Sequence, residues 1–192
     1  MDKLIGLGQT YTFSDEDIRK SCDYNVNVMT YTDLAKANSL DECFIVSGEL
    51  NKDSPKYGKD VGACALLYMT KQNFGHWVCF FRDPSDPDGT IQFFDSYGLM
   101  PDDELQFVPA HFRKQSDQDI PHLTWLFKYS KYKKFIYNMD KLQRVFSDVN
   151  TCGRWVATRL GLRSIPTKTF QQMFLNQKFQ PDWYVTAITL MV

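Results

Sequence analysis

The chain has 192 residues, of which 43% are hydrophobic, enough for one domain with a sizeable buried core. Lys and Arg number 22 and Asp and Glu number 23, so the net charge of -1 gives no basic excess of the kind that marks an obligate nucleic-acid-binding protein. The longest apolar run, 63–69, is too short to cross a bilayer, and the first residues show no signal-peptide or transit-peptide pattern. We therefore expect a single domain over residues 1–192 that is soluble, intracellular and without a membrane partner.

Cysteine and histidine spacing argues against a disulfide framework and against a metal site. The chain has five cysteines, an odd number with no CxxC pair: Cys22, Cys43, Cys64, Cys79 and Cys152. Its histidines also lack the close spacing of metal ligands: His76, His111 and His122. We expect mostly free thiols, no metal and no cofactor. Four of the cysteines have the surroundings of small buried hydrophobic residues, whereas Cys152 has different neighbours.

The first half of the chain predicts short helices followed by three strands. Short helices are expected at 14–21, with Ser14 as the candidate N-cap, and at 32–37. Runs that are apolar on both faces, or rich in aromatic and β-branched residues, predict buried strands at 62–69, 76–82 and 90–95. Because a Pro-, Asp- and Gly-rich turn lies between the last two runs, these two strands are expected to form a hairpin.

The second half predicts edge strands and then helices. Aromatic residues and lysines within 124–138 favour one or two edge strands. From Thr151, a candidate N-cap, apolar residues recur at helical spacing as far as Gly161. Another helix is expected at 167–177, and a short apolar helix or strand at 183–192. The sum is an α+β domain.

The hairpin is predicted to bring a histidine and an aspartate together. Opposed residues of an antiparallel pair have a constant index sum, which a loop centred near residue 85 or 86 sets at roughly 170 to 172. His76 and Asp95 sum to 171, so we expect their side chains within reach of a hydrogen bond. A carboxylate that accepts from one ring N–H leaves the other ring nitrogen free to take a proton.

Cys152 is the candidate nucleophile, because the amides in the first turn of a helix favour a thiolate there. Gly153 has no Cβ and would let backbone N–H groups approach an oxyanion closely. Gln143 can supply a second, side-chain donor to that oxyanion, and Asn138 and Asn150 are weaker candidates for the same role.

Each of these residues alone also has an ordinary structural interpretation. His76 can be a core or rim residue, and Asp95 can open a turn through its side chain. The conjunction of a matched His and Asp pair with a cysteine at a helix start is what favours chemistry. His111 and His122 have no such partners and are expected to be structural. The lysine run 128–134, which includes two tyrosines, favours a solvated edge strand, with contact to nucleic acid as the alternative.

At these residues the sequence resembles the superfamily of cysteine proteases that contains the adenovirus maturation protease (adenain) and the SUMO proteases. The shared pattern is His-Trp at a strand start, an acidic residue closing the next strand, a Gln, and then Cys-Gly on a helix. The matching segments here are 75–77, 94–98, 142–143 and 150–155. They look most like the adenain-like proteases of virophages and Maverick/Polinton elements.

The resemblance implies an adenain-like fold, with a central mixed or antiparallel sheet packed by helices and the nucleophile at a helix N-terminus. It also implies a cysteine endopeptidase that cleaves capsid or other virion precursor proteins during particle maturation, after small residues such as Gly-Gly. Such a protein would work in the virion or in the host-cell cytoplasm, as a monomer and without a cofactor. The residues that the resemblance assigns to the site are His76, Asp95, Gln143 and Cys152, with Trp77 and Gly153 beside them.

Two other functions remain open at this point. One is an isopeptidase that removes ubiquitin or a ubiquitin-like modifier. The other is a catalytically silent, capsid-associated protein that retains the fold. Selective reactivity of Cys152 would argue against the second alternative.

Overall fold

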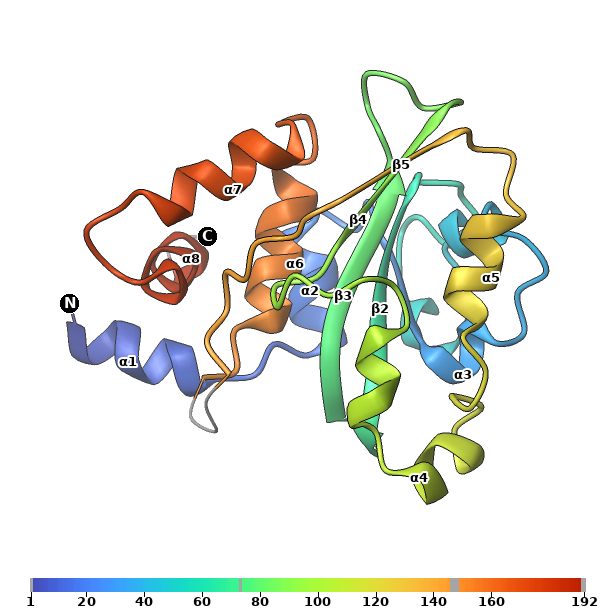
Figure 1. Ribbon diagram of the computed structural model, residues 1–192, viewed down its shortest axis with the longest axis horizontal. Helices are drawn as coiled ribbons and strands as arrows, with labels where there is room; N and C mark the ends of the chain where they lie inside the picture. The colour runs from blue at the N-terminus through green and yellow to red at the C-terminus, as the bar shows by residue number, and fades with distance from the viewer. Residues whose placement is uncertain (1, 73, 146–148, 191–192) are drawn as a thin grey trace.

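The computed structural model describes residues 2–72, 74–145 and 149–190, which form an α+β structure around a mixed sheet (Figure 1). The strands are β1 (Asn27–Thr30), β2 (Ala63–Lys71), β3 (Phe74–Arg82), β4 (Thr90–Phe94) and β5 (Lys134–Tyr137). They lie side by side in the order β1-β2-β3-β4-β5. The β2–β3 and β3–β4 pairs are antiparallel, whereas β1 and β5 are parallel to their neighbours. The three predicted strands and their hairpin are confirmed.

Both faces of the sheet are covered, which explains why the central strands are apolar at nearly every position. In β3 the side chains of Trp77 and Phe81 belong to the core on one face, and those of Val78 and Phe80 to the core on the other. The sheet therefore separates two hydrophobic cores.

Helices from the two ends of the chain cover the first face, and helices from its middle cover the second (Figure 1). On the first face lie α2 (Asp15–Ser21), α6 (Cys152–Gly161), α7 (Thr167–Leu175) and α8 (Pro181–Leu190), with α1 (Asp2–Thr10) against α8. On the second lie α3 (Tyr31–Leu34), α5 (His122–Lys128), and the short 3-10 helices η1 (Glu42–Phe44) and η3 (Asp103–Phe107). The remaining elements are η2 (Glu49–Asn51) and α4 (Ala110–Gln115).

The predicted helix at 14–21 is confirmed, and its capping is reciprocal. The Asp17 N–H donates to Ser14 Oγ at 3.2 Å, and the Ser14 N–H donates to Asp17 Oδ2 at 2.8 Å. Such a capping box satisfies two backbone donors that the helix itself leaves unpaired. The second predicted helix is shorter than expected and spans Tyr31–Leu34.

The prediction of one or two edge strands within 124–138 is confirmed for one strand, β5, but the first part of the range is helical. This part lies in α5, because Leu123 and Leu126 are buried at helical spacing against the sheet while Trp125 and Tyr129 face solvent. Only β5 is a strand, and it does lie at the sheet edge. The lysines of the run are exposed, and Lys131 forms an ion pair with Asp41 at 3.1 Å.

The C-terminal elements are helical. The helix expected at 167–177 ends at Leu175, and the last apolar segment is helical as far as Leu190; residues 191 and 192 lie outside the described part. All five cysteines are free, as expected. None of the helices in the described ranges has the length and apolarity that crossing a bilayer requires.

Candidate active site

The site lies where β3 extends beyond the end of β4. β4 pairs with only the second half of β3, from Cys79 to Arg82, so residues 74–78 of β3 have no partner on that side. The observed index sum of the hairpin is 173, and the predicted 170 to 172 is therefore wrong. By this register the position opposite His76 is 97, beyond the last paired residue of β4.

His76 and Asp95 nevertheless form a buried hydrogen bond, with 2.8 Å between His76 Nε2 and Asp95 Oδ1. The bond forms because Asp95 lies beyond the last paired residue of β4, in a turn closed by the hydrogen bond from the Gly98 N–H to the Asp95 carbonyl, so its side chain does not follow the register of the ladder. The Tyr97 N–H also donates to Asp95 Oδ1, at 2.7 Å. Asn138 fixes the Asp95 backbone by accepting from its N–H at 3.0 Å and donating to its carbonyl at 2.5 Å. Because the Asn138 amide is used in this way, it is not the oxyanion donor considered above.

The environment of His76 favours the protonated imidazole. Burial lowers its pKa, but the charge and hydrogen bond of Asp95, and then those of Cys152, outweigh burial and hold the pKa well above its ordinary value. The Tyr97 ring stacks on the imidazole at a centroid distance of 4.4 Å and an angle of 17°. The hydrogen bond to Asp95 therefore holds the His76 imidazole within its plane, and the Tyr97 ring packs against its face.

Cys152 is the first residue of α6, as predicted, and its thiol contributes to the raised pKa of His76. Thr151 occupies the predicted N-cap position, but its side chain makes no capping hydrogen bond. Its hydroxyl donates instead to Asp182 Oδ1, at 2.5 Å. The buried Asp182 carboxylate also accepts from Trp155 Nε1 at 3.1 Å and from the Arg144 N–H at 2.9 Å. It therefore joins the segment beside Gln143 to the start of α6.

Gln143 is buried on the segment that leads toward Cys152, and its amide group is oriented by three neighbours. Its Oε1 accepts from Ser96 Oγ at 2.7 Å. Its Nε2 donates to Tyr97 Oη and to the Val149 carbonyl, both at 3.3 Å. Asn150 is directed elsewhere, because its Nδ2 donates to the Thr10 carbonyl at 3.2 Å. All three amide side chains considered for the oxyanion donate to other groups in this structure. Gln143 is kept as the candidate because one of its acceptors, Tyr97, stacks on the His76 ring, which places the amide beside the cluster.

Gly153 and Trp77 contact a residue from the N-terminal segment, in which the sequence showed no motif. A Cβ at position 153 would lie 2.5 Å from the Phe13 Cβ, so the close approach of Phe13 requires glycine there. Trp77 Nε1 donates to the Phe13 carbonyl at 3.2 Å. Packing is thus one sufficient reason for Gly153.

The other two histidines lie apart from this cluster. His122 Nε2 lies 2.9 Å from the Ala37 carbonyl, and His111 is exposed on α4. These contacts agree with the structural roles expected for both residues.

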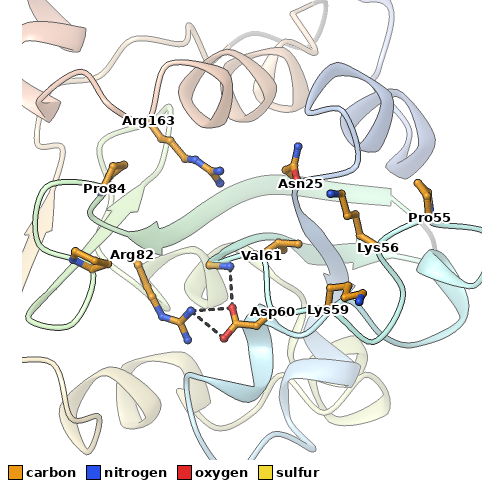
Figure 2. A pocket seen from close by; sticks show the side chains of 11 residues that line it. Asn25, Pro55, Lys56, Lys59, Asp60, Val61, Arg82, Pro84 and Arg163 are labelled. Atoms are coloured by element: carbon orange, nitrogen blue, oxygen red, sulfur yellow. Dashed lines mark hydrogen bonds and ion pairs between the residues drawn. The ribbon is translucent and has the colours of Figure 1, made fainter.

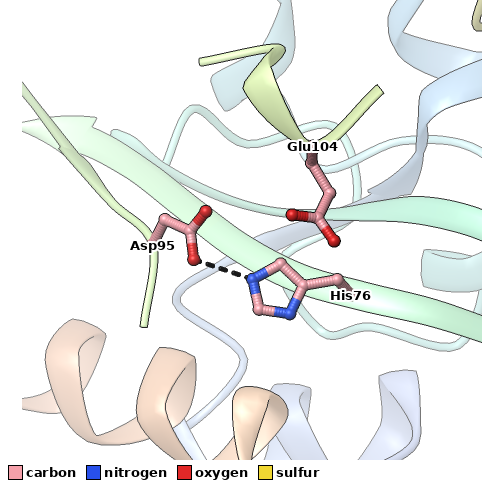
Figure 3. Close-up of side chains that lie close together, drawn as sticks. All are labelled: His76, Asp95 and Glu104. Atoms are coloured by element: carbon pink, nitrogen blue, oxygen red, sulfur yellow. Dashed lines mark hydrogen bonds and ion pairs between the residues drawn. The ribbon is translucent and has the colours of Figure 1, made fainter. Parts of the chain in front are cut away.

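Glu104 is a site residue that the sequence analysis missed. One ring nitrogen of His76 and one carboxylate oxygen each of Asp95 and Glu104 lie within 4.8 Å of one another. Figure 3 shows both carboxylates turned toward the imidazole ring. Glu104 follows Asp95 by nine residues across a turn, and no local pattern indicates that the chain folds back here.

A second feature is a surface cavity of about 760 Å³ with a basic lining (Figure 2). Lys56, Lys59 and Arg163 contribute to it, together with Arg82, which forms an ion pair with Asp60 at 2.7 Å. None of the predicted site residues lines this cavity, so it is separate from the Cys152 cluster.

Together, the fold and the site define a mixed α+β protein with a buried Cys–His–Asp cluster at the open end of its sheet. No protein-family model matches the chain. The chain is 35% identical over 192 residues to "Uncharacterized protein V9" of Sputnik virophage, covering 98% of this chain and 99% of that protein, and it belongs to the family of that virophage protein.

Among solved structures, the chain is similar to crystal structures of ASFV pS273R protease. The first has a TM-score of 0.49 at 14% identity, and its Se-Met form has a TM-score of 0.46 at 16% identity. In both comparisons the alignment covers 94% of this chain and 67% of the protease chain.

Proposed function

We propose that the chain is a cysteine endopeptidase with Cys152 as its nucleophile. One observation carries the proposal: the imidazole of His76 is hydrogen-bonded to Asp95 through Nε2, and both Asp95 and the Cys152 thiol act on it to raise its pKa. A nucleophile, a base and a group that orients the base are the parts that acyl transfer needs.

In the proposed reaction, His76 takes the Cys152 proton and the thiolate attacks the scissile carbonyl. The imidazolium then gives that proton to the leaving amine, and an acyl-enzyme remains on sulfur. A water molecule, deprotonated by His76, attacks the thioester and restores the thiol. Asp95 keeps the proton on Nε2 and leaves Nδ1 to serve the sulfur. In Figure 3 the second ring nitrogen points away from both carboxylates.

We assign stabilisation of the oxyanion to the Cys152 backbone N–H and the Gln143 side chain. Ser96 holds the Gln143 oxygen, and the amide nitrogen donates to Tyr97 Oη and to the Val149 carbonyl at 3.3 Å, so in this proposal the oxyanion replaces one of these two acceptors. Donors that are fixed before reaction stabilise the developing charge without a cost of reorganisation.

A cavity of about 270 Å³ beside His76 supports a peptide as the substrate. Gly75 and Trp77, the two neighbours of His76 on β3, both line it, and half of its other lining residues are apolar. The further lining residues are Thr12, Phe13, Ser14, Asp15, Thr30, Leu50, Leu67 and Phe74. We propose that it takes a side chain of the substrate next to the scissile bond.

The sequence resemblance and the virophage relative support the narrower proposal of an adenain-like protease that matures virion precursor proteins. On this proposal the substrate is a capsid or other virion protein cleaved after small residues, and the place of action is the virion or the viral factory. A monomeric state is part of the same proposal, and contact of the lysine run 128–134 with nucleic acid is the alternative to a solvated edge.

Thiol labelling provides the first test. At neutral pH, iodoacetamide should label Cys152 at least about tenfold faster than the other cysteines, because His76 favours its thiolate. Burial raises the pKa of Cys22 and of Cys43 to about 12, and it also raises the pKa of Cys64 and Cys79. Peptide mass spectrometry of a time course gives each rate. Uniform slow labelling would instead favour the catalytically silent protein.

Substrate mapping provides the second test. Co-expression with virion proteins, followed by mass-spectrometric mapping of new N-termini, should show cleavage after small residues. A ubiquitin-like modifier carrying a C-terminal vinyl sulfone should label Cys152 poorly. Efficient labelling by that probe without cleavage of any virion protein would favour the isopeptidase.

A further inference from the structure

A third acidic residue stands beside the His76–Asp95 pair and has no role in the reaction above. Glu104 comes from η3, on the opposite face of the sheet from α6, and reaches the cluster through the gap left by the short strand β4. One oxygen of its carboxylate lies within 4.8 Å of a ring nitrogen of His76 and of a carboxylate oxygen of Asp95 (Figure 3).

The carboxylate of Glu104 is buried, and one of its two oxygens has no hydrogen-bond partner among the described residues. The residue is 6% exposed, and that oxygen is Oε2. A buried, unpaired carboxyl oxygen destabilises a fold, so packing alone gives no reason for glutamate at this position. The pKa of Glu104 lies above its ordinary value: burial raises it most, the positive charge of His76 lowers it, and the charge of Asp95 raises it. Glu104 is thus electrostatically coupled to both.

We propose that Glu104 is a positioning residue that acts through His76: its negative charge stabilises the imidazolium that pairs with the Cys152 thiolate. This inference rests on the proposed cysteine-protease function and adds a second acidic group to the same site.

The other groups around the cluster do not replace this charge. Those that titrate are His76 on β3, Asp95 and Tyr97 after β4, and Cys152 on α6. Burial raises the pKa of Tyr97, so the phenol is neutral over the working range. The cation nearest to Glu104 in sequence, Arg113 on α4, donates to the Leu105 carbonyl at 3.3 Å. In the described part of the chain, Asp95 and Cys152 raise the pKa of His76, and Glu104 is the further acidic group whose own pKa responds to the charge of His76.

The sign of the expected effect follows directly. A negative charge next to an imidazolium favours the protonated form, so the ring keeps its proton to a higher pH. Glu104→Gln removes the charge and keeps the shape, and it should lower the pH midpoint of His76 by about one unit. The basic limb of the cleavage profile should move to lower pH by the same amount.

Histidine NMR on the full chain tests this without requiring cleavage. The chain has three histidines, so a His76→Ala variant assigns the His76 resonance. The midpoint should fall in Glu104→Gln, return most of the way in Glu104→Asp, and stay unchanged in Asp103→Asn. Asp103 is the matched control because it is an exposed acid on the same 3-10 helix.

An unchanged midpoint in Glu104→Gln, or an equal fall in Asp103→Asn, would overturn the inference. Glu104→Met provides a second uncharged variant if thermal unfolding shows that the glutamine variant does not fold. If the His76 midpoint falls in Glu104→Gln but the wild-type chain cleaves no substrate, the coupling between Glu104 and His76 is retained and the proposed function is rejected. If the wild-type chain cleaves its substrate but Glu104→Gln leaves the His76 midpoint unchanged, the proposed function is retained and the role of Glu104 is rejected.

Discussion

Replacing Cys152 with alanine should reduce peptide cleavage by about 10³-fold to 10⁶-fold while leaving the chain folded. The loss is this large because no acyl-enzyme can form without the sulfur, and only the oxyanion donors and substrate binding remain. The sulfur is a small part of the core around α6, so its removal should cost about 1 kcal/mol of stability. Rates on a peptide containing a mapped cleavage site, with thermal unfolding of the same samples, measure both effects.

The matched control for this variant is Cys79→Ala. Cys79 is also a buried cysteine of the same core, but it lies on β3 three residues beyond His76. Its alanine variant should lose a similar amount of stability and keep cleavage within a few-fold of the wild-type rate. Equal activity of the Cys152 and Cys79 variants would rule out Cys152 as the nucleophile.

The parts of the site that could be predicted are those with a local sequence signal. Cys152 opens a helix whose apolar spacing is visible in the sequence, and His76 begins a strand marked by its aromatic residues. The strands were predictable for the same reason, since burial on both faces requires an unbroken apolar run. Within 124–138, aromatic residues and lysines favoured edge strands. The helix α5 in the first part of this range begins before it, and its buried residues Leu123 and Leu126 lie at helical spacing.

The residues that escaped prediction act through contacts distant in sequence. Asp182 bonds Thr151 from 31 residues away, and Asn138 bonds Asp95 from 43 residues away. Neither lies in a pattern that indicates its partner, because polar pairs of this kind depend on how helices and loops pack. Glu104 belongs to the same group.

The pairing of His76 with Asp95 was predicted with the wrong register. The loop arithmetic placed the two residues directly opposite each other, whereas the observed sum of 173 puts position 97 there. The pair forms because Asp95 lies beyond the last paired residue of β4, where Asn138 fixes its backbone and the chain no longer follows the ladder. The shift also places Tyr97 over the imidazole, a contact that the predicted register does not provide.

This geometry decides what Asp95→Asn should do. Because the Tyr97 N–H donates to the same Oδ1 that faces His76, an asparagine will keep its carbonyl oxygen in that position. The hydrogen bond to Nε2 is then preserved, and the main loss is the negative charge that raises the pKa of His76. We expect kcat/KM to fall by about 10-fold to 10³-fold and the basic limb of its pH profile to move to lower pH.

Asp95→Ala separates charge from orientation, since it removes the acceptor as well. Its kcat/KM should fall by about 10²-fold to 10⁴-fold, further than that of the asparagine variant, because the ring is then free to adopt the wrong tautomer. Steady-state rates from pH 5 to 10 for both variants and wild type measure the two contributions. If the asparagine variant loses as much as the alanine variant, its amide has turned its NH₂ group toward His76, and the Tyr97 N–H does not hold the oxygen. If neither variant differs from wild type, Asp95 does not orient the base.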